Sequence, residues 1–272
     1  MKVYLSADME GVAGVADWDQ CRVGAPAHAE GARLLLGEVN AAIEGALEAD
    51  ADQVVVNDSH GLMANLAPDR LAGRASYLSG RHKPDYMMQG LDSSYDAALF
   101  IGYHGSMPSA SVLSHTYNPR AVSDARIGGI RAAESGINAL AAAGHGVPVV
   151  LVTGDQVVGP EAEPFCPGIR VAVVKESQSR EAALSVHPDV AREIVRAAAA
   201  EALAARDAWS MPRVPGDLEV DLLTADMAEI ATAVRGVVRS AERTVTIATA
   251  DPLAAYRSFV AVVAITRHLS PA

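Results

Sequence analysis

Short apolar runs rich in β-branched residues alternate along this chain with longer stretches rich in alanine and leucine, and this alternation constrains the fold more than any other feature. Five runs predict strands that are apolar on both faces, which is typical of buried parallel strands. They lie at residues 3–7, 54–57, 98–103, 149–153 and 171–175. Since parallel strands need crossover connections, the pattern predicts an α/β fold with a layered, mostly parallel sheet and crossover helices.

Two stretches predict amphipathic crossover helices. Residues 29–49 carry apolar side chains at four-residue spacing, and residues 188–205 repeat the pattern. The proline- and glycine-rich segment 211–216 then marks a boundary. Beyond it we expect a short segment at 218–224, a helix near 226–240, a strand at 244–249 and a closing helix at 252–268. The sequence therefore predicts an α/β catalytic domain over residues 1–210 and a small α+β appendage over residues 211–272.

Charge and hydropathy exclude several classes of partner. The chain has 22 basic and 33 acidic residues, a net charge of −11, and no run of Lys or Arg that could follow a phosphate backbone, so no nucleic acid is expected. No apolar run approaches the ~18 residues that a membrane span needs. Asp8 comes too early for a signal peptide, so we expect a cytoplasmic protein. Cys21 and Cys166 lack the close spacing of a zinc knuckle or a redox pair.

Acidic and histidine side chains follow the first three predicted strands. Asp8 and Glu10 come after the first, His60 after the second and His104 after the third. Open α/β sheets bind ligands at the carboxyl ends of their strands, and positions two apart in an extended segment project to the same side. A divalent cation relieves the repulsion between two such carboxylates, and added imidazoles give a ligand set that suits zinc or a similar transition metal.

The alternative for each of these residues alone is an ordinary polar side chain at a strand end. Accidental convergence of all four is the weaker interpretation. A bridging carboxylate among them would indicate two metals, the arrangement used in metal-assisted hydrolysis. Competing motifs are absent from the sequence: there is no G-x-G-x-x-G after a strand, no Walker loop and no G-x-S-x-G elbow.

Several segments, taken together and in order, resemble the zinc D-aminopeptidase family, the DppA-like peptidases, and the likeness runs over most of the chain. The matching segments are SADMEG at 6–11, VNDSHG at 56–61, KP at 83–84, MQG at 88–90, FIGYH at 100–104, SHT at 114–116, ESGINA at 134–139 and VTGD at 152–155. The chain departs from the family pattern at Ala132 and Ala133, where Val-Gly is usual, and at Gly105, where Ala is usual.

The resemblance implies a site for two zinc ions with Asp8 as the bridging ligand. It adds a fifth ligand, Glu134, to the four found at strand ends. The implied ligands are Asp8, Glu10, His60, His104 and Glu134. It also assigns the catalytic role to His115, which could transfer a proton, stabilise an oxyanion or act as a nucleophile. The family further implies a homo-oligomer, a decamer of two stacked pentameric rings whose active sites face an enclosed chamber.

Other polar residues near these motifs have a functional and a structural interpretation. Asn138 could bind substrate or His115, or make a local helix bond. Lys175 and Arg180 could hold a substrate carboxylate, or form a solvated pair. Asp58 and Asp155 could orient metal-binding imidazoles.

The leading hypothesis is a zinc-dependent aminopeptidase that hydrolyses the N-terminal residue from short peptides, with the choice between a D- and an L-residue left open by the sequence. One alternative is a di-metal amidohydrolase acting on a non-peptide amide or ester. The other is a metal-holding peptide-binding protein without turnover. The apolar helix at 256–266 must be covered either by the rest of the chain or by another subunit, so it gives the oligomer modest support.

Overall fold

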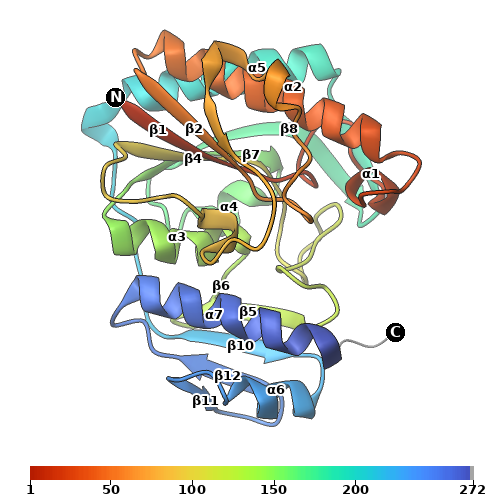
Figure 1. Cartoon of the computed structure of the whole chain (residues 1–272), viewed down its shortest axis with the longest axis vertical. Helices are drawn as coiled ribbons and strands as arrows, with labels where there is room; N and C mark the ends of the chain where they lie inside the picture. Colours follow the sequence, from red (N-terminus) through yellow and green to blue (C-terminus); the bar gives the residue numbers. More distant parts are fainter. Residues whose placement is uncertain (270–272) are drawn as a thin grey trace.

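Seven strands form the central sheet, in the order β3-β2-β1-β4-β7-β8-β9 (Figure 1). The computed structural model describes residues 1–269, so residues 270–272 of the predicted appendage lie outside the described residues. All pairings are parallel except β8 with β9. The strands are β1 (Lys2–Ala7), β2 (Gln53–Asp58), β3 (Ser76–Leu78), β4 (Ala97–Tyr103), β7 (Val149–Asp155), β8 (Arg170–Ser179) and β9 (Ala182–Ser185).

The predicted α/β class and all five predicted strands are confirmed, as β1, β2, β4, β7 and β8. Every residue of β4 and β7 is buried, which agrees with their apolar sequences. The edge strands β3 and β9 were not predicted, because they are short and largely exposed and so carry no apolar run.

Both predicted crossover helices cover the same face of this sheet. They are α2 (His28–Glu48) and α5 (Pro188–Ala204), which pack against each other (Figure 1). A Cβ atom at Gly45 would lie 2.3 Å from the Arg196 carbonyl oxygen, so glycine permits this close contact. Along β1, Val3 and Leu5 face the α2 and α5 layer, whereas Tyr4 belongs to the core on the other side of the sheet.

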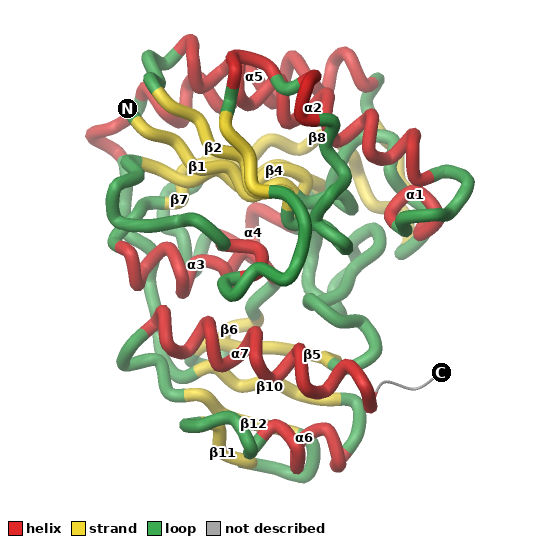
Figure 2. The backbone as a smooth tube through the Cα atoms, viewed as in Figure 1, coloured by secondary structure: helices red, strands yellow, loops and turns green. Residues whose placement is uncertain are grey.

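The opposite face is covered by α3 (Glu134–His145) and α4 (Val158–Ala162). Beyond them lies α7 (Pro252–Thr266), which separates this layer from a second sheet (Figures 1 and 2). Four large side chains of α7 are buried, and its main partner is α3. The chain therefore covers most of this helix itself, through α3 and the second sheet rather than through the central sheet. The buried side chains are Tyr256, Phe259, Val262 and Val263.

The second sheet has the order β11-β12-β10-β5-β6 and is antiparallel. Its strands are β5 (Val122–Ile127), β6 (Ile130–Arg131), β10 (Leu218–Leu222), β11 (Val237–Arg239) and β12 (Thr244–Ile247). Two of them, β5 and β6, come from the middle of the chain. The predicted α+β unit was built from residues 211–272 alone and did not include them. The boundary at residue 210 stays a prediction.

The predicted helix near residues 226–240 is wrong in extent. Helix α6 (Ala225–Ala231) ends early, and β11 begins at Val237. The chain turns at Gly236, whose φ of 85° lies in the left-handed region that glycine adopts without strain. Within residues 1–269, no helix is both long enough and apolar enough to cross a membrane.

Candidate metal centre

Three loops meet at the carboxyl edge of the central sheet, where β2, β1 and β4 are neighbours. Asp8 and Glu10 follow β1, His60 follows β2 and His104 follows β4. All four side chains are buried, with His60 the most exposed at 7%. The structure therefore brings together the side chains that the strand ends indicated.

Asp8 lies between the two histidines. Its Oδ1 is 3.1 Å from His60 Nδ1, and its Oδ2 is 3.5 Å from His104 Nε2. Glu10 approaches only one of these histidines closely, with Oε2 at 2.9 Å from His60 Nδ1. The two oxygens of Asp8 thus face different imidazoles, which is the placement that a bridging carboxylate requires.

Glu134 enters the site from the other side, as the first residue of α3. Its Oε1 lies 3.7 Å from His104 Nε2 and 3.7 Å from His115 Nε2, and it accepts a 2.6 Å hydrogen bond from the Tyr117 amide. Strand-end reasoning missed Glu134 because it follows β6 of the second sheet. An acidic residue in the first turn of a helix that lacks a side-chain N-cap is the local signal for it, since the helix N-terminus favours negative charge.

Each of the three imidazoles uses one nitrogen to contact a backbone carbonyl. A carbonyl oxygen can only accept, so that nitrogen carries a hydrogen, and the other nitrogen faces the carboxylates, where its lone pair would be available to a bound cation. Fixing the tautomer in this way is common for metal-binding histidines. The pairs are His60 Nε2 with Cys21 O at 2.7 Å, His104 Nδ1 with Gly105 O at 2.9 Å and His115 Nδ1 with Leu113 O at 3.0 Å.

Three buried polar atoms at this site have no hydrogen-bond partner among the described residues. They are Asp8 Oδ2, His104 Nε2 and Glu10 Oε2, the last of which contacts His60 Nδ1 as an ion pair but without hydrogen-bond geometry. Ligand atoms of Asp8, Glu10 and His104 lie within 4.8 Å of one another, and so do those of His104, His115 and Glu134. Unpartnered buried donors and acceptors are costly, and a divalent cation bound by oxygen and nitrogen satisfies them. The donor set therefore fits a pair of zinc-like ions.

The electrostatics of the buried cluster agree with this fit. Burial raises the pKa of Glu134 to about 8, and burial together with the charge of Glu10 raises that of Asp8. Burial opposes the charged form of His60, but Glu10 and Asp8 outweigh it and hold the His60 pKa well above its usual value. Without another cation, the carboxylates thus draw a proton onto an imidazole.

His115 has the opposite character. Burial, and then the neighbouring His104, lower its pKa to about 3. Its ring stacks on His104 with centroids 4.3 Å apart and meets Trp18 edge-on at 5.5 Å. His115 is therefore held as a neutral imidazole whose Nε2 faces the carboxylates.

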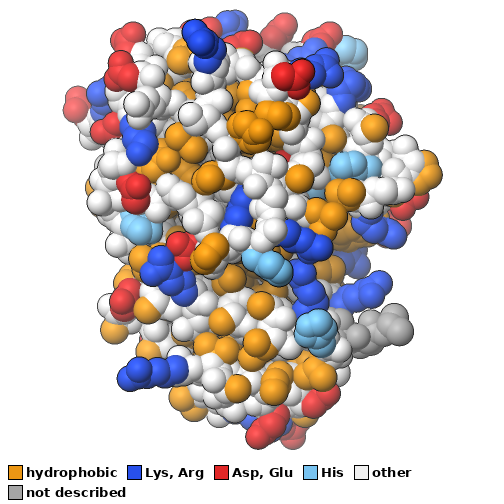
Figure 3. Space-filling view, viewed as in Figure 1, with side chains coloured by type: hydrophobic (Ala, Val, Ile, Leu, Met, Phe, Trp, Pro, Cys, Tyr) orange, Lys and Arg blue, Asp and Glu red, His pale blue; other side chains and the backbone are white. Residues whose placement is uncertain are grey.

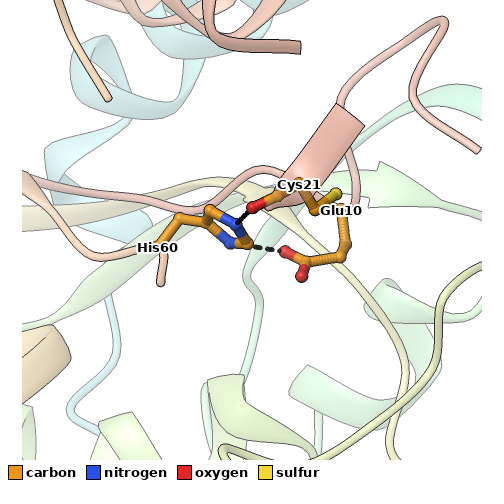
Figure 4. A group of neighbouring side chains, drawn as sticks. All are labelled: Glu10, Cys21 and His60. Atoms are coloured by element: carbon orange, nitrogen blue, oxygen red, sulfur yellow. Dashed lines mark hydrogen bonds and ion pairs between the residues drawn. The ribbon is translucent and has the colours of Figure 1, made fainter. Parts of the chain in front are cut away.

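Cys21 lies at the same site, a position that the spacing of the cysteines did not indicate. It ends the short helix α1 (Trp18–Cys21), and its sulfur lies within 4.8 Å of ligand atoms of Glu10 and His60 (Figure 4). Its carbonyl oxygen accepts from His60, as the dashed line in Figure 4 marks. Burial raises the pKa of the thiol well above its usual range, so it is protonated as it stands.

Two buried lysines fix the loops that carry the carboxylates and His60. Lys175 Nζ donates to the carbonyl oxygens of Glu10 at 2.5 Å, Val12 at 3.0 Å and Val15 at 2.6 Å. Lys83 Nζ donates to Asn57 Oδ1 and the Asp58 carbonyl, both at 2.7 Å. The predicted role of Lys175 in holding a substrate carboxylate, and its alternative as a solvated group, are both wrong, because the side chain is 1% exposed and fully used by the backbone.

Other predicted roles also change. Arg180 donates to the Ser114 carbonyl at 2.9 Å and so supports the segment that carries His115. Asn138 accepts from Tyr117 at 2.5 Å and donates to Tyr103 at 2.8 Å, so its role is structural but joins distant segments, unlike the predicted local helix bond. Asp58 and Asp155 do not orient imidazoles. They accept hydrogen bonds from Asn65 and Ser111 respectively.

Gly105 and Gly102 are required by close packing. A Cβ atom at Gly105 would lie 2.6 Å from Ser111 Cβ, so the departure from the family's usual alanine accompanies a serine that fills the space. Gly102 has a φ of 72°, and a Cβ there would lie 2.2 Å from the Asp8 carbonyl oxygen. The backbone of β4 at Gly102 therefore packs directly against the backbone that carries Asp8, and this close packing brings Asp8 near His104.

Comparison with known proteins gives concordant matches. A family model described as D-aminopeptidase matches residues 1–261. A curated D-aminopeptidase of Bacillus subtilis (strain 168) is 33% identical over 268 residues, which is 96% of this chain and 96% of that protein. A solved structure of the Zn-dependent D-aminopeptidase DppA from Bacillus subtilis, described as a self-compartmentalizing protease, has a TM-score of 0.90 and 32% identity over 96% of each chain. The likeness in fold therefore extends over nearly the whole chain.

Proposed function

Because this chain belongs to the D-aminopeptidase family, we propose that it is a zinc-dependent aminopeptidase that hydrolyses the N-terminal residue, a D-amino acid, from short peptides. The observation that carries the proposal is the convergence of three carboxylates and two imidazoles with unpartnered buried atoms. A non-peptide amidohydrolase and a peptide-binding protein without turnover are not favoured. A cytoplasmic location remains part of the proposal.

In this proposal two ions are held by Asp8, Glu10, His60, His104 and Glu134. Asp8 would serve both ions, because its two oxygens face different histidines. Glu10 and His60 would hold one ion, and His104 and Glu134 would hold the other. When bound, such a pair supplies a water acidified towards a pKa of ~7 and polarises the scissile carbonyl.

His115 is assigned the proton transfer. Its Nδ1 hydrogen is used by the Leu113 carbonyl, so the free Nε2 carries a lone pair and can accept a proton. A neutral imidazole in this tautomer has no hydrogen to offer an oxyanion from Nε2. The tautomer therefore disfavours oxyanion stabilisation by Nε2. It is compatible with proton transfer and with a nucleophilic role, and trapping an acyl-enzyme tests the second.

We expect protein purified without chelator to contain about two zinc ions per chain and to cleave D-residue dipeptides faster than their L-counterparts. Elemental analysis measures the first quantity, and a panel of matched D- and L-peptides measures the second. Removal of metal with a chelator abolishes cleavage, and added zinc restores it. A zinc-loaded sample that binds these peptides without cleaving any of them contradicts the proposal and supports the peptide-binding alternative.

The assembly is proposed to be a decamer of two stacked pentameric rings that encloses the active sites. Support comes from the self-compartmentalizing relative. We expect light scattering at micromolar concentration to give about ten times the 28.3 kDa chain mass. A mass near that of one chain contradicts the assembly. Rapid cleavage of the N-termini of folded proteins contradicts the enclosed chamber even when the oligomer is found.

A further inference from the structure

Two cavities adjoin at the candidate metal centre. The inner cavity, about 370 Å³, is lined by Asp8, His60, His115 and Glu134 at its metal end. The outer cavity, about 580 Å³, runs along α7. Arg81, Tyr86, Tyr117 and Arg267 line both of them. The inner cavity is at the small end of the range for ligand sites, so it suits a peptide of two or three residues.

The junction of the two cavities is built from rigid and charged groups. Tyr86 and Tyr117 stack with ring centroids 5.4 Å apart, and the Tyr117 hydroxyl is held by Asn138. Burial raises the pKa of Tyr86, and the charge of the nearby Arg267 is the main influence against that rise. The guanidinium of Arg267, which follows α7, thus lies beside an aromatic wall of the inner cavity.

This region is basic although the chain as a whole carries a net charge of −11. Figure 3 shows Lys, Arg and His side chains gathered in the middle of the face, between the parts built on the two sheets. No Asp or Glu among residues 1–269 lines the outer cavity. Arg257, at its edge, forms a two-point ion pair with Asp85, whereas neither Arg81 nor Arg267 has a carboxylate partner within the described part of the chain.

We propose that Arg81 and Arg267 bind the C-terminal carboxylate of the peptide substrate, so that the site selects dipeptides and tripeptides with a free C-terminus. The inference rests on the proposed function. It assigns the far end of the substrate to residues that lie outside the metal-binding and proton-transfer groups.

Peptide chemistry supports this assignment. A short unmodified peptide carries its negative charge at the C-terminus, and guanidinium groups bind carboxylates through paired, charge-assisted hydrogen bonds. The proposed cleavage places the scissile carbonyl at the metal end of the inner cavity, so the C-terminus of a dipeptide or tripeptide lies one or two residues further on, toward the arginine end. The two ends of the substrate then lie at opposite ends of the cavity. The length of the peptide therefore decides whether it can reach both.

The test compares D-Ala-D-Ala with its C-terminal amide on the metal-loaded protein. We expect kcat/KM for the free acid to exceed that for the amide by about tenfold or more, because one charge-assisted contact is lost in the amide. Arg267→Ala and Arg81→Ala reduce this preference, because cleavage of the free acid falls more than cleavage of the amide, and Arg267→Lys retains part of the preference. Arg257→Ala, which removes a paired arginine of the outer cavity only, leaves the preference intact.

Calorimetric binding of the same two ligands to the metal-loaded protein separates this inference from the proposed function. If no peptide is cleaved but the free acid binds more tightly than the amide in an arginine-dependent way, the function fails and the inference stands. If the free acid and the amide are cleaved and bound alike, and the arginine variants do not change the ratio of their kcat/KM values, the inference fails and the function stands. If the protein prefers D-Ala-Asp amide over D-Ala-Asn amide in an Arg267-dependent way, but does not prefer the free acid, the inference is overturned. Arg267 would then bind an acidic side chain of the substrate instead of its C-terminus.

Discussion

His115→Ala is expected to lose on the order of a hundredfold or more in turnover while it keeps its metal and its fold. The imidazole Nε2 is the free nitrogen at the edge of the carboxylate cluster, 3.7 Å from Glu134 Oε1. Its removal takes away the base and leaves the five proposed ligands unchanged. Steady-state kinetics on a D-dipeptide, together with elemental analysis of the same preparation, measures both effects.

Trp18→Phe is the matched control for this variant, because it changes the ring that packs against His115 without removing the base. We expect a much smaller loss of activity in that control. If His115→Ala loses zinc together with activity, His115 is a ligand. The group of His104, His115 and Glu134 would then be the ligand set of one ion.

Asp8→Ala is expected to lose both ions, and with them essentially all cleavage. Asp8 is the one carboxylate whose oxygens face both His60 and His104. Glu10→Ala and Glu134→Ala are the matched comparisons, since each removes a carboxylate proposed to serve one ion. We expect these two variants to keep about one ion per chain. Elemental analysis after identical purification gives the three stoichiometries.

The Asp8 variant is not expected to fail through unfolding. Burial and the charge of Glu10 raise the pKa of Asp8, and Glu10 still lies 2.9 Å from His60 Nδ1 when Asp8 is removed. We therefore expect His60 to keep one carboxylate partner in the variant. Circular dichroism of the metal-free parent and variant checks this point. An Asp8→Ala protein that retains both ions contradicts the bridging assignment.

The sequence predicted the central sheet well because its inner strands are buried on both faces. Continuous apolar runs such as those of β4 and β7 are hard to place anywhere except in a covered parallel sheet. Edge strands and the two-residue β6 give no such signal, since solvent-exposed positions accept any residue. The second sheet was only partly predicted, because it joins β5 and β6 to strands nearly a hundred residues away, as the pairing of Asp124 with Asp221 illustrates.

Four residues of the candidate site could be placed from the sequence because they follow neighbouring strands of one sheet. Glu134 and His115 could not be placed in this way. Glu134 depends on where α3 begins, and His115 lies in the long loop between β4 and β5. The error at Lys175 has a different cause. Lys175 is buried and donates to three backbone carbonyl oxygens, and such contacts leave no pattern in the sequence. The sequence therefore suggested an exposed lysine after a strand.

The unit formed by the second sheet and α7 borders the cavities but contributes no side chain after residue 210 to the proposed ligands or base. Its Arg267 reaches the substrate end of the inner cavity from a turn that follows α7. Part of substrate choice is thereby assigned to a stretch of the polypeptide that takes no part in bond cleavage, whereas Arg81 lies between the proposed ligands His60 and His104 in the sequence. A directed-evolution library confined to residues 257–268 would sample new peptide preferences while the hydrolytic machinery stays as it is.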